Sequence, residues 1–147
     1  SKTTKNNIAG IITYESIGYL FPIGDPESPT LCTALTAQCA FGPLGVPLED
    51  FKKLAKLKKI QFVWGDNRPE TEQQVILSRL SAKLINKYGG NAEVIKLGDL
   101  PGFQGNTHIP FMDMNNDKVA DMLFKVLKKN KLDSYQRKNR GRWSWSN

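Results

Sequence analysis

The chain of 147 residues contains a single histidine, His108. It lies just beyond a glycine-rich stretch, residues 98–105, which follows a short apolar run at residues 92–97. In open α/β sheets, ligands bind beyond the carboxyl ends of the strands, and an imidazole placed there is suited to proton transfer near neutral pH. A lone histidine is more often a structural or exposed residue, but its position, the flanking glycines and the neighbouring Asn106 favour a catalytic base.

Two carboxylates follow other apolar runs and are candidate partners of this base. Glu15 comes directly after residues 8–14, and Asp66 follows residues 60–64 after one glycine. A carboxylate at the same sheet edge as His108 would accept the imidazole N–H and stabilise the imidazolium that forms during proton transfer. A surface acid is an equally good interpretation of Glu15 on position alone, and Asp66 competes for the same role.

The sequence lacks a recognisable serine nucleophile. No Gly-x-Ser-x-Gly segment occurs, the pattern that places a serine on the strained turn between a strand and a helix. Cys32 and Cys39 have no neighbour that identifies an activating partner for a thiolate. The chain therefore offers a base and two candidate acids without a convincing nucleophile of its own.

The two cysteines also bear on the cellular compartment. Six residues separate Cys32 from Cys39, so a local disulfide is expected if the protein is exported, for example to the periplasm. Two buried free thiols in a cytoplasmic protein fit the spacing about equally well. No Cys/His cluster has the spacing of a metal site, so we expect neither a metal nor another cofactor.

The composition predicts a folded domain. Hydrophobic residues make up 39% of the chain and charged residues 24%, which is enough apolar material for a packed core. No apolar run approaches the roughly 20 residues that would span a bilayer. We therefore expect no membrane span.

The net charge of +7 raises nucleic acid as a candidate partner. The tail at residues 134–147 carries +4 of this charge and contains Trp143 and Trp145, which could stack on bases. The body carries only +3, and most of its lysines fall in helix-like stretches, where a solvated helix face is the simpler interpretation. A nucleic-acid function is therefore disfavoured and would rest on the tail alone.

The pattern of apolar residues predicts an α/β fold. Short β-branched apolar runs predict strands at residues 8–14 (buried on both faces), 60–64 and 92–97. Apolar residues at helical spacing predict helices at residues 48–59, at residues 71–88, and from residue 115 or 116 to residue 130. Helices between strands imply parallel crossovers. Three strands make a thin parallel sheet, so we expect part of the sheet to lie elsewhere.

Side-chain patterns also predict local features of these elements. The expected inner positions of the 71–88 helix are Ile76, Leu77, Leu80, Leu84, Ile85 and Tyr88, and those of the last helix are Val119, Leu123, Val126 and Leu127. An asparagine at position 115 or 116 is expected to cap the last helix. Residues 18–47, rich in proline and glycine, are expected to form a long irregular excursion of the kind that is more often functional than idle.

Three segments resemble bacterial esterases of the α/β-hydrolase superfamily. They are IAGIITYES at residues 8–16, KKIQFVWGDNRPE at residues 58–70, and LPGFQGNTHIPFMDMNNDKVADMLFKVLKKNKLD at residues 100–133. The best-matched block is Gly105-Asn106-Thr107-His108 followed by Asp113-Met114-Asn115-Asn116. The similarity extends over about residues 8–133 and does not include the tail.

This resemblance implies a fold and a catalytic arrangement. Residues 1–133 would be the C-terminal half of one α/β-hydrolase domain, with parallel strands six to eight, covering helices, and a sheet completed by a missing N-terminal segment. In one branch of the superfamily the acid is a glutamate after strand six, which corresponds to Glu15, and the base corresponds to His108. Asp66 would then be a strand-seven residue near the site.

The resemblance also implies a partner and a substrate class. The nucleophilic serine and the oxyanion hole would lie upstream of Ser1, in a missing N-terminal segment or in a separate chain, as in a heterodimer or a fragment. The substrate would be a small ester, and residues 18–47 would form a lid or pocket. The residues expected to line that pocket are Phe21, Leu31, Phe41 and Leu44.

Two other functions remain open from the sequence. A non-catalytic binding protein that retains the hydrolase shape would explain the missing nucleophile if the chain acts alone. A nucleic-acid binder would use residues 134–147. The esterase portion, inactive without its other half, is the function that the catalytic residues and the resemblance favour.

Overall fold

The structure is a computed structural model that describes residues 8–32, 39 and 41–133. Its central sheet has three parallel strands in the order β1 (Gly10–Tyr14), β4 (Lys59–Trp64) and β5 (Ala92–Lys96). The predicted α/β order and the parallel pairing are therefore confirmed. The basic tail at residues 134–147 lies outside the described residues.

The three strands differ in how deeply they are buried. The central strand β4 is buried along its whole length, whereas each residue of β1 is only half-buried. The expectation that residues 8–14 are buried on both faces is therefore wrong for this structure. The reason is positional, because β1 pairs with β4 on one side and with none of the other described strands on its outer side.

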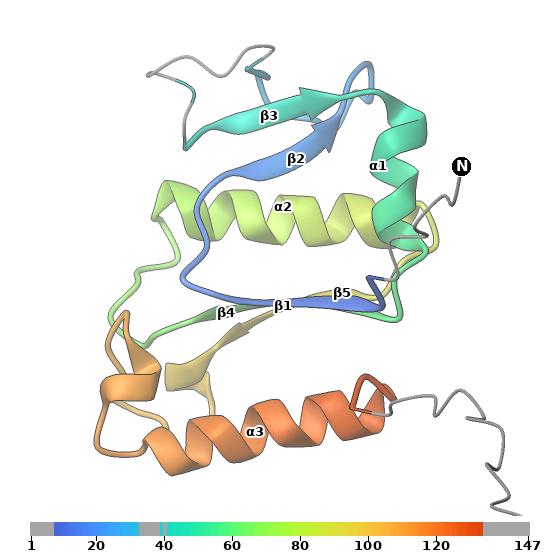
Figure 1. Ribbon diagram of the computed structural model, residues 1–147. Coiled ribbons are helices and arrows are strands. Elements are labelled where there is room, and N and C mark those ends of the chain that lie inside the picture. Colours follow the sequence, from blue (N-terminus) through green and yellow to red (C-terminus); the bar gives the residue numbers. More distant parts are fainter. Residues whose placement is uncertain (1–7, 33–38, 40, 134–147) are drawn as a thin grey trace, which may run out of the picture.

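Helices cover both faces of the sheet. Figure 1 shows α2 (Gln73–Lys87) on one face and α3 (Asn116–Lys129) on the other, with α1 (Leu48–Ala55) beside α2. The larger core, between the sheet and α2, includes the fully buried Trp64 and Leu84. A smaller core beneath α3 is built on Val63, Leu97 and Val119.

Several predicted boundaries need correction. The helix predicted at residues 48–59 ends at Ala55, because Lys59 opens β4 and pairs its ammonium group with Glu93 on β5 at 2.8 Å. Leu97 does not extend β5 but begins a short 3-10 helix, η1 (Leu97–Asp99). A second 3-10 helix, η2 (Pro110–Met112), precedes α3. In α3 only Val119 is fully buried among the four predicted inner positions, and the other three are half-buried.

Residues 18–47 are less irregular than expected. They contain β2 (Tyr19–Pro22) and β3 (Pro43–Val46), which pair in parallel as a separate small sheet. Figure 1 shows α2 lying between this small sheet and the central one. Cys32 and Cys39 form a disulfide with Cα atoms 5.8 Å apart, so the first of the two alternatives for these cysteines is the one observed. Among the described helices, none is long and apolar enough to cross a membrane.

A polar cluster fastens this excursion to α2. Asp25 accepts hydrogen bonds from Tyr88 at 2.5 Å and from Lys87 at 2.9 Å. Glu27 pairs with Lys83 and, at 3.0 Å, with Lys87. The hydrogen bond from Tyr88 is the largest of the effects that lower the pKa of Asp25 to about 2.

The paired charges predict a pH dependence of stability. Because the pKa of Asp25 falls from an ordinary 3.8 to about 2 on folding, its contribution to the free energy of unfolding is present above pH 3.8 and is lost as the pH falls toward 2. Asp25→Asn should therefore remove part of the acid dependence of urea unfolding measured from pH 6 to pH 2. Asp50→Asn, which alters an exposed pair with Lys53 on α1, is the control and should leave that dependence unchanged.

The inner face of α2 yields a second prediction. Ile76 was expected to be buried, but it is 50% exposed, whereas Ile85 is 1% exposed. Ile85→Ala should lower the free energy of unfolding by about 2–5 kcal/mol because it leaves a cavity in the core. Ile76→Ala should change it by no more than about 0.5 kcal/mol. Equal losses in urea titrations of the two variants would contradict the observed packing.

Candidate functional site

The three central strands end at one edge, and each is followed by a residue of the candidate site. Glu15 follows β1, Gly65 and Asp66 follow β4, and the segment after β5 and η1 returns to the same edge before reaching His108. Parallel strands place their carboxyl ends together. The expectation that these residues share one edge of the sheet is met by the topology.

Gly65 lies between Glu15 and the loop that carries His108. Its N–H donates to Glu15 Oε1 at 2.6 Å. A Cβ atom at this position would lie only 2.2 Å from the carbonyl oxygen of Thr107, so the backbone just before His108 passes directly against Gly65. The N–H of Asp66 donates to the carbonyl of Asn106 at 2.9 Å, which fastens the same segment to the end of β4.

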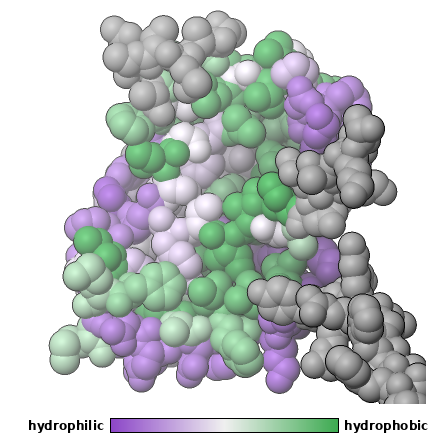
Figure 2. Space-filling view, in the orientation of Figure 1, coloured by the Kyte–Doolittle hydropathy of each residue, from purple (hydrophilic) through white to green (hydrophobic). Residues whose placement is uncertain are grey.

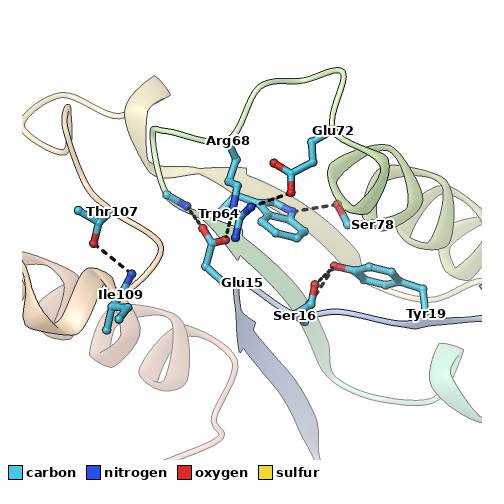
Figure 3. A network of polar contacts seen from close by, with 10 residues as sticks. Glu15, Ser16, Tyr19, Trp64, Arg68, Glu72, Ser78, Thr107 and Ile109 are labelled. Atoms are coloured by element: carbon cyan, nitrogen blue, oxygen red, sulfur yellow. Dashed lines mark hydrogen bonds and ion pairs between the residues drawn. The ribbon is translucent and has the colours of Figure 1, made fainter. Parts of the chain in front are cut away.

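Glu15 is held by more than this amide. Its other oxygen, Oε2, accepts from Arg68 Nε at 2.7 Å, and Arg68 Nη1 in turn donates to Glu72 Oε1 at 2.7 Å. Figure 3 shows Arg68 between the two carboxylates. The hydrogen bond and charge of Glu15 raise the pKa of Arg68 above its ordinary value, so the guanidinium stays charged.

The backbone of Glu15 is also unusual. Its φ angle is +50°, in the left-handed region that side chains other than glycine rarely adopt. Such a conformation costs on the order of 1–3 kcal/mol and persists where surrounding contacts determine it. The N–H of Glu15 donates to the carbonyl of Val63 at 2.9 Å, and its side chain is only 9% exposed. The turn therefore carries the chain away from β1 while directing the carboxylate back over the end of β4.

His108 lies in the open part of the site. Its side chain is exposed and lines a surface hollow of about 360 Å³ together with Asn67 and Arg68. Within residues 8–32, 39 and 41–133, the imidazole makes no hydrogen bond, and Glu15 bonds to Gly65 and Arg68. Glu15 and His108 thus make no direct bond in this structure, but Arg68, which bonds to Glu15, lines the same hollow as His108.

A second polar network holds the loop that carries His108. The buried Asn106 donates through Nδ2 to Asp113 and to Asn115, both at 2.8 Å. Asp113 also accepts from the N–H and the hydroxyl of Thr107, each at 2.8 Å. The Asn106 bond is the largest effect that lowers the pKa of Asp113, and the charge of His108 acts in the same direction. These hydrogen bonds fix Asn106 and Thr107, the two residues immediately before His108.

Asn115 has a different role from the one expected. It precedes α3 as the N-cap residue, but its side chain makes no capping bond. Instead its amide donates to Asn106 at 2.9 Å and to the carbonyl of Gly102 at 3.3 Å. The prediction of an asparagine side-chain cap is therefore wrong, because the side-chain oxygen that a cap requires accepts from Asn106 Nδ2 at 2.8 Å instead.

Asp66, the rival acid, faces the glycine-rich loop. Its Oδ2 accepts from the N–H of Gly105 at 2.8 Å. A Cβ atom on Gly98 would lie 1.7 Å from Asp66 Oδ1, so the carboxylate occupies the space that a side chain there would need. Asp66 thus binds the backbone that leads to His108, whereas Glu15 bonds to the arginine that lines the hollow.

The four residues expected to line a substrate pocket lie in different environments. Phe21 is fully buried in the larger core, and Leu31 packs against that core. Leu44 is half-buried on β3, and Phe41 is 58% exposed. Phe21 therefore supports the fold of the excursion, and Phe41 is the member that is most open to a ligand.

Two parts of the site were not predicted from the sequence. Arg68 was not singled out, although its i,i+4 spacing from Glu72 is a pattern typical of an ion pair. The roles of Asp113 and Asn115 in fixing the loop were not predicted either. Among the described residues, no group of three or more His, Cys, Asp or Glu side chains is arranged to hold a metal ion.

Comparisons with known proteins returned few matches. No family model matches the chain, and no curated protein matches it. One similar solved structure is described as "the atomic resolution structure of a novel bacterial esterase". The two are 28% identical with a TM-score of 0.49, over 56% of this chain and 26% of that one. The match therefore spans about a quarter of the length of that protein.

The close approach at Gly65 predicts a strong effect of adding one methyl group. Gly65→Ala should push the Thr107 carbonyl away and lower the free energy of unfolding by about 1–3 kcal/mol. Hydrogen exchange should also become faster at the amide of Thr107, whose acceptor is Asp113. Asn67→Ala, two residues along and exposed, is the matched control. Unchanged protection of Thr107 in Gly65→Ala would mean that the two backbones are not in contact.

Proposed function

We propose that this chain is the base- and acid-bearing portion of a serine carboxylic-ester hydrolase of the α/β-hydrolase type. His108 is the general base and Glu15 is the acid that orients it. The nucleophilic serine and the oxyanion hole are supplied by an N-terminal segment or a separate chain. The observation that carries the proposal is the junction at Gly65, which brings the Glu15 carboxylate and the backbone before His108 to one edge of a parallel sheet.

The reaction follows from these roles. The partner's serine attacks the ester carbonyl while His108 takes the hydroxyl proton, and backbone N–H groups of the missing part stabilise the oxyanion. His108 then gives the proton to the leaving alcohol. A water molecule, deprotonated by the same imidazole, releases the acid product from the serine. Each oxygen of Glu15 keeps a second lone pair beyond its bonds to Gly65 and Arg68, which leaves it able to accept the imidazole N–H.

The unpaired side of β1 supports the need for a further segment. Grooves of about 190 Å³ and about 460 Å³ flank this strand, with Ile11 in the first and Ile12 in the second. These neighbouring residues point to opposite faces of the sheet. Figure 2, drawn from the side that presents β1, shows apolar side chains gathered around the middle of this face. An added parallel strand with flanking helices would cover this surface, as parallel sheets require.

Contacts favour Glu15 over Asp66 as the acid. Glu15 lies 9% exposed, and its arginine partner lines the hollow that contains His108. Asp66 is bonded to the backbone N–H of Gly105, which gives it a structural role in the loop. The exposed imidazole of His108 lines the same hollow as the arginine that bonds to Glu15, which favours Glu15 as its partner.

Variants of the complete enzyme test the proposed roles. With the serine-bearing part present, His108→Ala should abolish hydrolysis of a short-chain aryl ester. Glu15→Gln should lower kcat by on the order of 10²- to 10⁴-fold, because the imidazolium loses its charged partner. Asp66→Asn should have a smaller effect on kcat at equal protein stability. A larger loss for Asp66→Asn would transfer the acid role to that residue.

The need for a partner is tested separately. Native mass spectrometry should detect a second polypeptide, or a longer chain, that carries a serine in a Gly-x-Ser-x-Gly segment. An active chain that proves monomeric without such a segment would refute the proposal. An inactive monomer of this kind would support a non-catalytic protein that keeps the hydrolase shape.

A further inference from the structure

Arg68 bonds to Glu15 and to Glu72, next to the start of α2, and lines the same hollow as His108. Its Nε bonds to Glu15 at 2.7 Å and its Nη1 bonds to Glu72 at 2.7 Å, next to the start of α2. Its side chain is 35% exposed and lines the hollow beside His108. A simple surface ion pair joins one cation to one carboxylate. Arg68 instead bonds to two carboxylates and also lines the hollow that contains His108.

The geometry of these bonds requires a guanidinium group. Arginine presents several N–H donors in a rigid planar fork, whereas the lysine ammonium is a compact charge on a flexible stem. Here Arg68 donates from Nε to Glu15 and from Nη1 to Glu72, so its side chain is fixed at two points. The Gly65 N–H fixes the other oxygen of Glu15 at 2.6 Å. Together these donors determine the plane in which the carboxylate presents its remaining lone pairs.

We propose that Arg68 is a positioning residue for the esterase reaction, which orients the Glu15 carboxylate toward His108. The inference rests on the proposed function and goes beyond it, because it adds a further residue to the proposed pair of Glu15 and His108. Glu72 in turn holds Arg68 in place by accepting a hydrogen bond from its Nη1.

The test uses the complete enzyme with its serine-bearing part. Arg68→Ala should lower kcat roughly 10- to 100-fold, because a misplaced carboxylate no longer orients the base. Arg68→Lys, which keeps the charge without the planar fork of donors, should recover little of kcat. Added guanidinium ion should partly restore kcat in Arg68→Ala and leave the Arg68→Lys enzyme unchanged.

A matched control comes from the neighbouring arginine. Arg79 makes a two-bond pair with Glu70 at 2.8 Å and 2.7 Å, is partly exposed, and bonds to neither candidate catalytic residue. Arg79→Ala should therefore leave kcat unchanged. Circular dichroism of both alanine variants checks that they fold.

The outcomes separate the two levels of the proposal. A kcat for Arg68→Ala within about twofold of the parent, with His108→Ala inactive, overturns the positioning role alone. A loss of kcat that added guanidinium does not rescue also overturns it and leaves Arg68 with a structural role alone. Full activity of both His108→Ala and Glu15→Gln would instead refute the proposed function itself.

Discussion

The backbone crossing at Gly65 is the constraint on which the site depends. Gly65 donates its N–H to Glu15. Because Gly65 has no Cβ atom, the carbonyl of Thr107 packs directly against its backbone. A hydrogen bond from a backbone N–H to a charged acceptor contributes roughly 1.5–3 kcal/mol. That is similar in size to the strain of about 1–3 kcal/mol expected for the left-handed backbone of Glu15. Glu15 is therefore held in a strained turn by Gly65, which also contacts the segment before His108.

The sheet beneath the crossing explains why this edge is well defined. β4 is buried along its whole length, so apolar contacts lie on both of its faces. Besides Lys59 at its start, one polar residue lies within this buried strand: Gln61, which donates to Glu93 on the neighbouring strand at 2.8 Å. That pair matches the register between β4 and β5, in which Gln61 lies opposite Glu93. A polar tie in a buried strand specifies the alignment that apolar contacts alone leave less certain.

Local sequence patterns predicted the order of elements but not all of their faces. Apolar runs and helical spacing located all three central strands and three helices. This is expected because buried strands are runs of apolar residues and buried helix faces repeat apolar residues at helical spacing. Ile76 was misassigned because the N-terminal half of α2 turns Val75 and Ser78 inward, and Ser78 accepts the indole N–H of Trp64. A buried serine breaks the apolar stripe, so the period alone pointed to the wrong side of the helix. The partner on β4 that explains it lies 14 residues earlier.

Some residues of the candidate site could be predicted from local sequence, and others only from contacts between distant parts of the chain. His108 and Glu15 were found from the sequence because each follows a strand, whereas Arg68 reaches Glu15 across 53 residues of chain. The two catalytic candidates are held by separate networks: Asn106, Asp113 and Thr107 for the base loop, and Arg68 with Gly65 for the acid. These networks meet at Gly65, so a change in one alters the other chiefly through that backbone contact. Because the contacts of Arg68 are to Glu15 and Glu72 and not to the loop at residues 105–113, a change at Arg68 acts first on the Glu15 carboxylate and leaves the contacts of Asn106 and Thr107 in place.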